Sequence, residues 1–226
     1  GFVSAYLEDT ARPFHRPPGG PVPSFAYGVG LWWEFLYLEF GELFVLDYYL
    51  SLAGNEVPDD DRALETLLGL IDLYGGNLDS LWDRFSMYNL ATGSRAGGLD
   101  SYRDAASMRG LAVEEIDLSA GVDATRYYPL TSHYYEFDWN ESFAWMGASQ
   151  ADGELRAAMV RAGTADTAAE VVSTFQFDQL PLNLADQGVE PGRYYLVVTN
   201  SAVGTSSIRT ALCFGESSDT LSCLPS

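Results

Sequence analysis

Apolar residues in the first half of the chain recur with the period of an amphipathic helix. Between residues 61 and 73 they stand at i, i+3, i+4 and i+7, as Leu64, Leu67, Leu68 and Ile71. This stripe predicts a helix that an aspartate at positions 59 to 61 caps and that Gly75 ends. A second helix is predicted from about Asn77 to Gly93, with the stripe Leu78, Leu81, Trp82, Phe85 and Tyr88. One or two further helical turns are predicted in residues 101–111, SYRDAASMRGL.

The segment Phe25–Ala53 is apolar on nearly every side, yet its charges exclude a membrane span. Its longest uncharged run, residues 25–33, has nine residues, whereas a spanning helix needs ~20. We predict one buried helix, or two helices broken at Gly41. Its carboxylates then have arginine partners such as Arg62, Arg84 or Arg95, or face something outside this chain; they are Glu34, Glu39, Glu42 and Asp47.

The second half has a different texture, with short β-like runs between turn residues. Seven runs follow from about Leu111: TRYYPL, SHYYEFDW, SFAWMGAS, LRAAMVRA, VVSTFQF, GRYYLVVTN and SIRTALCF. Their number and spacing predict an antiparallel β-sandwich. The fold class is therefore α+β, with a helical subdomain in residues 1–110 and a β-sandwich domain in residues 111–226. Within the first, Gly1–Tyr27 is expected to be an extended surface strap, because it contains RPFHRPPGGPVPSF.

The charge of the chain argues against nucleic acid as a partner. Thirty-two acidic residues against twelve basic ones, all arginine, give a net charge of −20, which repels phosphate backbones and anionic lipid. Such acidity suits a salty or extracellular setting. It also leaves calcium as an open possibility, with Pro58–Asp61 and Glu216–Asp219 as candidate loops, although neither has the ligand spacing of a calcium loop. No other cofactor is expected.

The two cysteines predict a disulfide between Cys213 and Cys223, which close the loop-like segment CFGESSDTLSC. A disulfide implies an oxidising compartment, so we expect an extracellular or cell-surface protein. Gly1 is neither an initiator methionine nor part of a signal peptide, and we interpret it as the result of processing or truncation, or as preceded by further chain.

Catalytic motifs are weak in this chain, and we expect no catalytic residues in it. His15 and His133 are its two histidines, and without HExxH or a close pair they do not indicate zinc. We interpret His133 as a satisfied strand residue flanked by tyrosines. Gly147–Ala151 loosely matches a serine nucleophile elbow but is interpreted as a turn, because both histidines precede it. Glycan binding by exposed aromatics, Trp139 among them, or cleavage by carboxylates in the apolar segment remains a third possibility.

Three motifs taken together carry a resemblance to a known family. They are YGVGLWWEFLYLEFG from Tyr27, LWDRFSMYNLATGSRAGG from Leu81, and SYRDAA from Ser101. They resemble the part of a family of secreted bacterial zincin-type metalloproteases that follows the catalytic region. The matching positions in residues 20–110 are Tyr27-Gly28, Trp82–Phe85, Asn89 and Thr92-Gly93. The second half, with VEPGRYYLVVTN at Val189–Asn200, is similar to bacterial pre-peptidase C-terminal domains.

The resemblance implies a supporting role and no catalysis by this chain, because HExxH does not occur in it. We expect the non-catalytic C-terminal portion of a secreted metalloprotease-like protein, which supports the fold and engages a surface or substrate. Its partner would be the upstream part of the same precursor or another extracellular protein, and a homo-oligomer is possible. The alternative is an extracellular assembly module, such as an envelope, filament or adhesion subunit.

Overall fold

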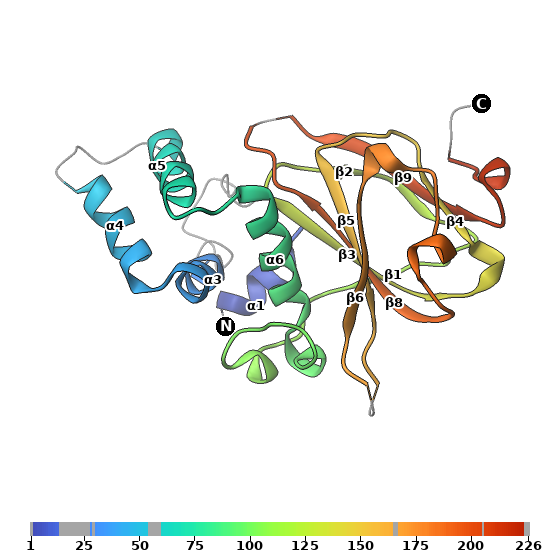
Figure 1. The fold of residues 1–226 in the computed structure, drawn as a ribbon, viewed down its shortest axis with the longest axis horizontal. Helices are drawn as coiled ribbons and strands as arrows, with labels where there is room; N and C mark the ends of the chain where they lie inside the picture. Colours follow the sequence, from blue (N-terminus) through green and yellow to red (C-terminus); the bar gives the residue numbers. More distant parts are fainter. Residues whose placement is uncertain are drawn as a thin grey trace.

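The structure is a computed structural model that describes residues 2–13, 28, 30–53, 60–164, 167–204 and 206–223. Its longer helices all precede its sheets (Figure 1). The helices are α1 (Phe2–Leu7), α3 (Gly30–Phe40), α4 (Glu42–Leu52), α5 (Asp60–Leu73) and α6 (Leu78–Leu90). The strands are β1 (Glu114–Glu115), β2 (Val122–Tyr127), β3 (Thr131–Trp139), β4 (Trp145–Ala148), β5 (Leu155–Arg161), β6 (Glu170–Gln176), β7 (Leu182–Asn183), β8 (Gly192–Asn200) and β9 (Ile208–Gly215). The predicted α+β class is confirmed.

The strands form two sheets, whose pairing is antiparallel except between β1 and β3. The five-stranded sheet has the order β1-β3-β8-β5-β6, and the four-stranded sheet has the order β2-β9-β4-β7. Each of the seven predicted β-runs contains or overlaps a strand, while β1 and β7, of two residues each, were not predicted. Runs that short carry no periodicity that a sequence could reveal.

Alternation along the strands divides the side chains of the five-stranded sheet between two cores. On β8, Leu196 and Val198 lie in the core shared with the four-stranded sheet, whereas Tyr195 and Val197 belong to the core shared with the helices. On β3, Tyr134 likewise joins the helical core. Successive residues of a strand point to opposite faces, so one sheet serves as the middle layer between the helices and the second sheet.

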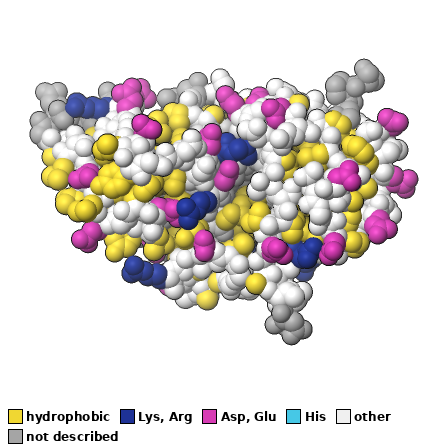
Figure 2. Space-filling model, in the orientation of Figure 1, with side chains coloured by type: hydrophobic (Ala, Val, Ile, Leu, Met, Phe, Trp, Pro, Cys, Tyr) yellow, Lys and Arg dark blue, Asp and Glu magenta, His cyan; other side chains and the backbone are white. Residues whose placement is uncertain are grey.

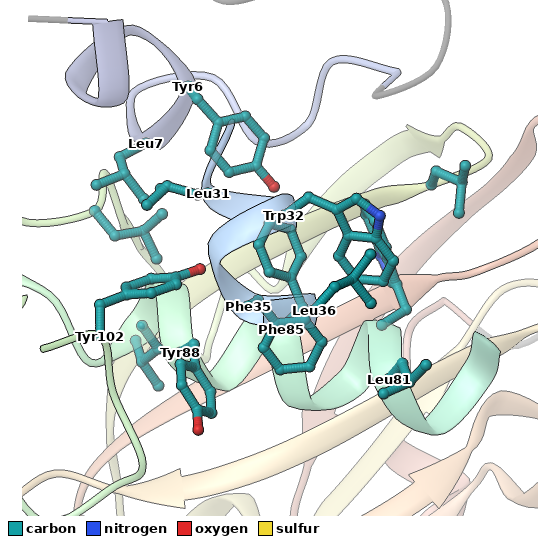
Figure 3. Packing of buried hydrophobic residues seen from close by; sticks show 14 of the residues in the cluster. Tyr6, Leu7, Leu31, Trp32, Phe35, Leu36, Leu81, Phe85, Tyr88 and Tyr102 are labelled. Carbon is teal, nitrogen blue, oxygen red and sulfur yellow. The ribbon is translucent and has the colours of Figure 1, made fainter. Parts of the chain in front are cut away.

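Helix α6 connects the helical half to this middle sheet. Asn77 caps its start by accepting a hydrogen bond from Ser80 N at 3.1 Å, and the helix begins where the sequence predicted, near Asn77. Its stripe is buried against α3, where Trp32 lies edge-on to Phe85 with ring centroids 5.0 Å apart (Figure 3). From the same helix, Trp82 Nε1 donates to the carbonyl of Thr131 at 3.1 Å.

Two expectations about the N-terminal half need correction. Phe2–Leu7 forms the short helix α1, with Tyr6 and Leu7 buried, so the predicted extended strap is wrong for these residues. The part of the predicted strap in residues 14–27 lies outside the described residues. The apolar segment forms two helices, and the predicted break at Gly41 is confirmed, since Gly41 has φ 83°. Its complete burial, however, is wrong for the outer side of α4.

The predicted disulfide is confirmed: Cys213, on β9, is bonded to Cys223 across ten positions of sequence. The ring holds the 3-10 turn Ser218–Thr220 against the end of β9, where Gly215 lies close to Thr220.

Loss of the disulfide is expected to lower the free energy of unfolding by ~2.8 kcal/mol, because a ring of this length restricts the unfolded chain only modestly. Urea denaturation of the Cys213→Ser/Cys223→Ser protein, compared with the oxidised wild type, measures this difference. A loss larger than about 5 kcal/mol would show that the ring supports native contacts of the sheet and does more than restrict the unfolded chain.

Candidate functional site

The outer face of α4 exposes large apolar side chains to solvent. Four residues of this helix are 51 to 61% exposed: Leu43, Leu46, Tyr49 and Leu50. Leu43, Leu46 and Leu50 have the i, i+3, i+7 spacing of a single helix face. At the end of the neighbouring α5, Leu73 is 74% exposed. In Figure 2 apolar side chains gather at the left of the molecule, over the region of α4 in Figure 1. We call Leu43, Leu46, Tyr49 and Leu50 the α4 apolar face.

This face exists because α4 is apolar on more sides than its neighbours can cover. Its inner side is occupied: Phe44 stacks on Phe40 at 4.8 Å and lies edge-on to Tyr74 at 5.2 Å between ring centroids. Tyr48 packs against Trp33. Contiguous exposed apolar side chains on a folded domain mark interaction sites.

The carboxylates of the apolar segment Phe25–Ala53 have different environments, and Glu42 and Asp47 lie on α4 itself. Glu39 is ion-paired with Arg84 at 2.5 Å, which confirms one of the three predicted arginine partners. Asp47 accepts a hydrogen bond from the Tyr74 hydroxyl at 2.6 Å. Glu42 is exposed at the start of α4 and has no ion pair among the described residues. The face therefore has an acidic margin.

Burial raises the pKa of two of these carboxylates. Desolvation raises the pKa of Glu39, an effect that the positive charge of Arg84 partly offsets. Desolvation also raises the pKa of Glu34, helped by the negative charge of Asp104 and opposed by Arg103. These shifts by themselves identify no catalytic pair.

A second candidate region lies between α6, the loop after it, and the β5–β6 hairpin. Two cavities border it, of about 430 and about 520 Å³, within the usual size of ligand pockets. The smaller is lined by Met87 of α6 and by Ala158 and Val171 of the hairpin. The larger is lined by Arg95, Val160 and Tyr195, among others. Val160 and Val171 are cross-strand partners, so the two cavities adjoin the same part of the hairpin.

Arg156 joins the helical half to the sheet at one end of this region. Its Nε and Nη2 donate to the two carboxylate oxygens of Asp83 at 2.8 and 3.0 Å. Asp83 also accepts from the Thr199 hydroxyl at 2.6 Å. Such a bidentate pair is both strong and directional. The partners lie 73 residues apart, and no feature of the sequence indicated this contact.

His133 is a partly buried histidine whose Nε2 atom is itself buried. It lies beside the Tyr127 ring, 4.5 Å between centroids, and is stacked on Tyr135, so its predicted tyrosine neighbours are present. Nε2, however, has no hydrogen-bond partner in the described structure, which corrects the expectation of a satisfied side chain. Burial lowers the pKa of His133 to about 4. The imidazole is therefore neutral at physiological pH.

The remaining sequence candidates do not converge on a site. Trp139 is buried and donates to the Phe143 carbonyl at 2.9 Å, so it is not free to stack on a sugar. Ser149, in the serine-elbow-like segment, bonds to Thr210 and to the backbone of Ala211. Glu216–Asp219 runs into the turn beside the disulfide. His15, Pro58 and Asp59 lie outside the described residues.

The described part of the chain contains neither a cluster of metal-ligating side chains nor a membrane-spanning helix. There, no group of three or more His, Cys, Asp or Glu side chains is arranged to hold a metal ion. In the same residues, no helix is both long enough and apolar enough to cross a bilayer. Comparison with models of known protein families finds no match, and comparison with curated protein sequences finds none either.

Proposed function

We propose that this chain is the non-catalytic C-terminal portion of a secreted metalloprotease-like protein and that it engages another polypeptide through the α4 apolar face. The observation that carries the proposal is that face: three leucines and a tyrosine, each more than half exposed on one eleven-residue helix. Leaving such side chains in water costs free energy that a protein partner recovers on binding.

Charge selects the kind of partner. The chain has a net charge of −20, and exposed Glu42 stands at the margin of the face. A second copy would bring the same negative charge, so self-association is opposed. The complementary occupant is a polypeptide surface with an apolar centre and a basic margin, which charge would also steer toward the face.

Two further observations support an extracellular module. The Cys213–Cys223 disulfide suits an oxidising compartment. The two sheets, which share a buried core that includes Met146, Leu196 and Phe214, support the interpretation of the second half as an antiparallel β-sandwich of the kind that the resemblance implies. The metalloprotease part of the proposal predicts that the gene encodes HExxH before Gly1, and reading the gene tests it.

Replacing Leu46 and Leu50 with serine is expected to weaken partner binding about 10- to 100-fold, since both leucines would lose apolar contact. The probe is a labelled helical peptide of about 18 residues with a leucine face and lysines beside it, measured by fluorescence anisotropy. A peptide with glutamate in place of lysine should bind weakly. Because both leucines are exposed, the free energy of unfolding should change by less than about 0.5 kcal/mol.

Val203→Ser is the matched control, since Val203 is a 45% exposed apolar residue beyond the end of β8. It should bind the lysine peptide as the wild type does. Equal binding by the Leu46→Ser/Leu50→Ser protein would refute the role of α4. Sedimentation separates the alternative of an assembly module: a wild type that associates with itself at high salt, where repulsion between the two acidic copies is screened, and that stops doing so in this variant, would identify a second copy as the occupant.

A further inference from the structure

Arg95 is a half-buried arginine that has no carboxylate partner among the described residues. It ends the 3-10 turn Gly93–Arg95 that follows α6. Its Nε donates to the Leu90 carbonyl at 3.2 Å and its Nη2 donates to the Leu111 carbonyl. The guanidinium lies over the Tyr195 ring, 5.7 Å from the centroid. These contacts orient the group without neutralising its charge.

Arg95 is without a carboxylate partner although the chain has 32 acidic residues against 12 basic ones. Arg84 and Arg156, in the same region, are each paired with a carboxylate. Partial burial of a cation without a counter-charge costs free energy. A structural role as a cap for the end of α6 accounts for the two carbonyl contacts, but it does not account for the remaining N–H groups.

Arg95 lines the cavity of about 520 Å³ together with the apolar residues Leu90, Leu99, Val160 and Tyr195 and with polar residues such as Ser94 and Thr167. Beside it, Gly98 (φ +85°) lies against the backbone of Ala168 and Ala169, so the loop after α6 touches the β5–β6 hairpin and bounds the cavity. A side chain at Gly98 would collide with that backbone.

The free N–H groups of Arg95 indicate which class of ligand the cavity would take. A guanidinium carries five N–H donors, of which the two carbonyl contacts use two. The remaining donors form part of a planar fork that suits a carboxylate. A phosphate dianion is disfavoured, because one arginine would have to balance two charges within a chain of net charge −20.

We propose that this cavity binds a carboxylate attached to an apolar body, with Arg95 holding the carboxylate and Leu99, Val160 and Tyr195 contacting the body. Two sources share this chemistry: a small free carboxylic acid and the C-terminal carboxylate of a peptide. The site is separate from the α4 apolar face, so either proposal can fail without the other.

Isothermal titration with hexanoate and with hexanamide tests the charge requirement on one apolar body. Hexanoate is expected to bind at least about 10-fold more tightly, because it alone makes charge-assisted hydrogen bonds. Acetyl-Ala-Ala-Leu with a free C-terminus, compared with its C-terminal amide, tests the peptide source. Tighter binding of the peptide acid than of hexanoate identifies a peptide terminus as the ligand, and the reverse order identifies a free acid.

Arg95→Gln should lower hexanoate affinity at least about 10-fold, and Arg95→Lys, which keeps the charge without the fork, should lower it less. Arg126→Gln, at an exposed arginine of β2, makes the same charge change elsewhere and should leave binding unchanged. Ser94→Trp narrows the cavity from an exposed lining position while Arg95 stays intact, and it should also weaken binding.

Thermal unfolding of each variant shows whether it is folded. If Arg95→Gln is unfolded, the Arg95→Lys and Ser94→Trp results decide the proposal. It is overturned if hexanoate and hexanamide bind equally, if neither acid binds at concentrations up to about 20 mM, or if a folded Arg95→Gln protein binds hexanoate as the wild type does.

Discussion

Trp82→Ala is expected to lower the free energy of unfolding by about 3 to 5 kcal/mol, the largest effect of any single change proposed here. Trp82 is 1% exposed. Its ring lies 5.4 Å from Trp32 and 5.3 Å from Phe85 between centroids, and its Nε1 donates to Thr131, at the start of β3. Truncation would remove the aromatic contacts, open a cavity, and leave the Thr131 carbonyl without this donor.

Guanidinium denaturation followed by tryptophan fluorescence and by far-ultraviolet circular dichroism measures this loss. Trp82→Phe keeps most of the ring and should lose less, about 1 to 3 kcal/mol, through the missing hydrogen bond and the smaller volume. Trp33→Ala is a matched control, because Trp33 is only partly buried and packs on Tyr48 at the outer helices. A Trp82→Ala loss no larger than that of Trp33→Ala would contradict a central role for Trp82.

The same experiment tests the predicted division into residues 1–110 and 111–226. The helical core includes Tyr134, Val160 and Val197 of the sheet, so a single cooperative transition is expected for the wild type. If removing the Trp82 ring uncouples the halves, the two optical signals of Trp82→Ala will change at different denaturant concentrations.

Acidification from pH 6.5 to pH 4 is expected to destabilise the fold by about 3 kcal/mol through His133. The pKa of His133 is about 4 in the folded protein, lowered by burial from an ordinary value of 6.5. Between these values the unfolded chain binds the proton and the folded chain does not, so stability is complete above pH 6.5 and falls as the pH falls. The difference between the two pKa values corresponds to about 3 kcal/mol.

Urea denaturation of the wild type and of His133→Phe, at several values of pH between 4 and 7, measures this contribution. A phenylalanine ring can occupy the place between Tyr127 and Tyr135, and no hydrogen bond to Nε2 would be lost. The variant should lose the decline. Raised pKa values at Glu34 and Glu39 act with the opposite sign, because these groups hold protons more tightly when folded, and this contribution is the same in both proteins.

His15→Phe, which removes the second histidine of the chain, should retain the wild-type decline. Parallel pH dependences for the wild type and His133→Phe would exclude His133 as the cause and would point to other groups. The comparison needs no assumption about the number of carboxylates that titrate in the same range, since these are common to both proteins.

Much of the local structure was predictable, because its causes lie within a few residues. Asn77 caps α6, and Gly75, with φ 76°, follows α5, as their side-chain chemistry and backbone freedom require. Period-3.6 and period-2 patterns located the main helices and the seven longer strands. The eleven-residue spacing of the cysteines indicated a local ring, and the four charges of Phe25–Ala53 excluded a membrane span.

The candidate sites depended on contacts between distant residues. An apolar pattern on every side of α4 indicates that the helix avoids water, but it does not state how many neighbours are present to cover it. On this helix the neighbouring elements bury only Phe44 and Tyr48. The leucine face is therefore left exposed. Likewise, Arg84 and Arg95 are chemically alike in sequence, and only the packing of α6 against α3 gives Arg84 a glutamate.

The sequence by itself thus determined the positions of the longer helices and strands, the charges that exclude a membrane span in the apolar segment, and the disulfide, because each follows from short-range chemistry. Tertiary structure decided the pairing of β3 with β8, the exposure of Leu46 and Leu50, and the cavity beside Arg95. These features depend on which surfaces meet when segments far apart in the chain pack together, and that information is not contained in any one segment.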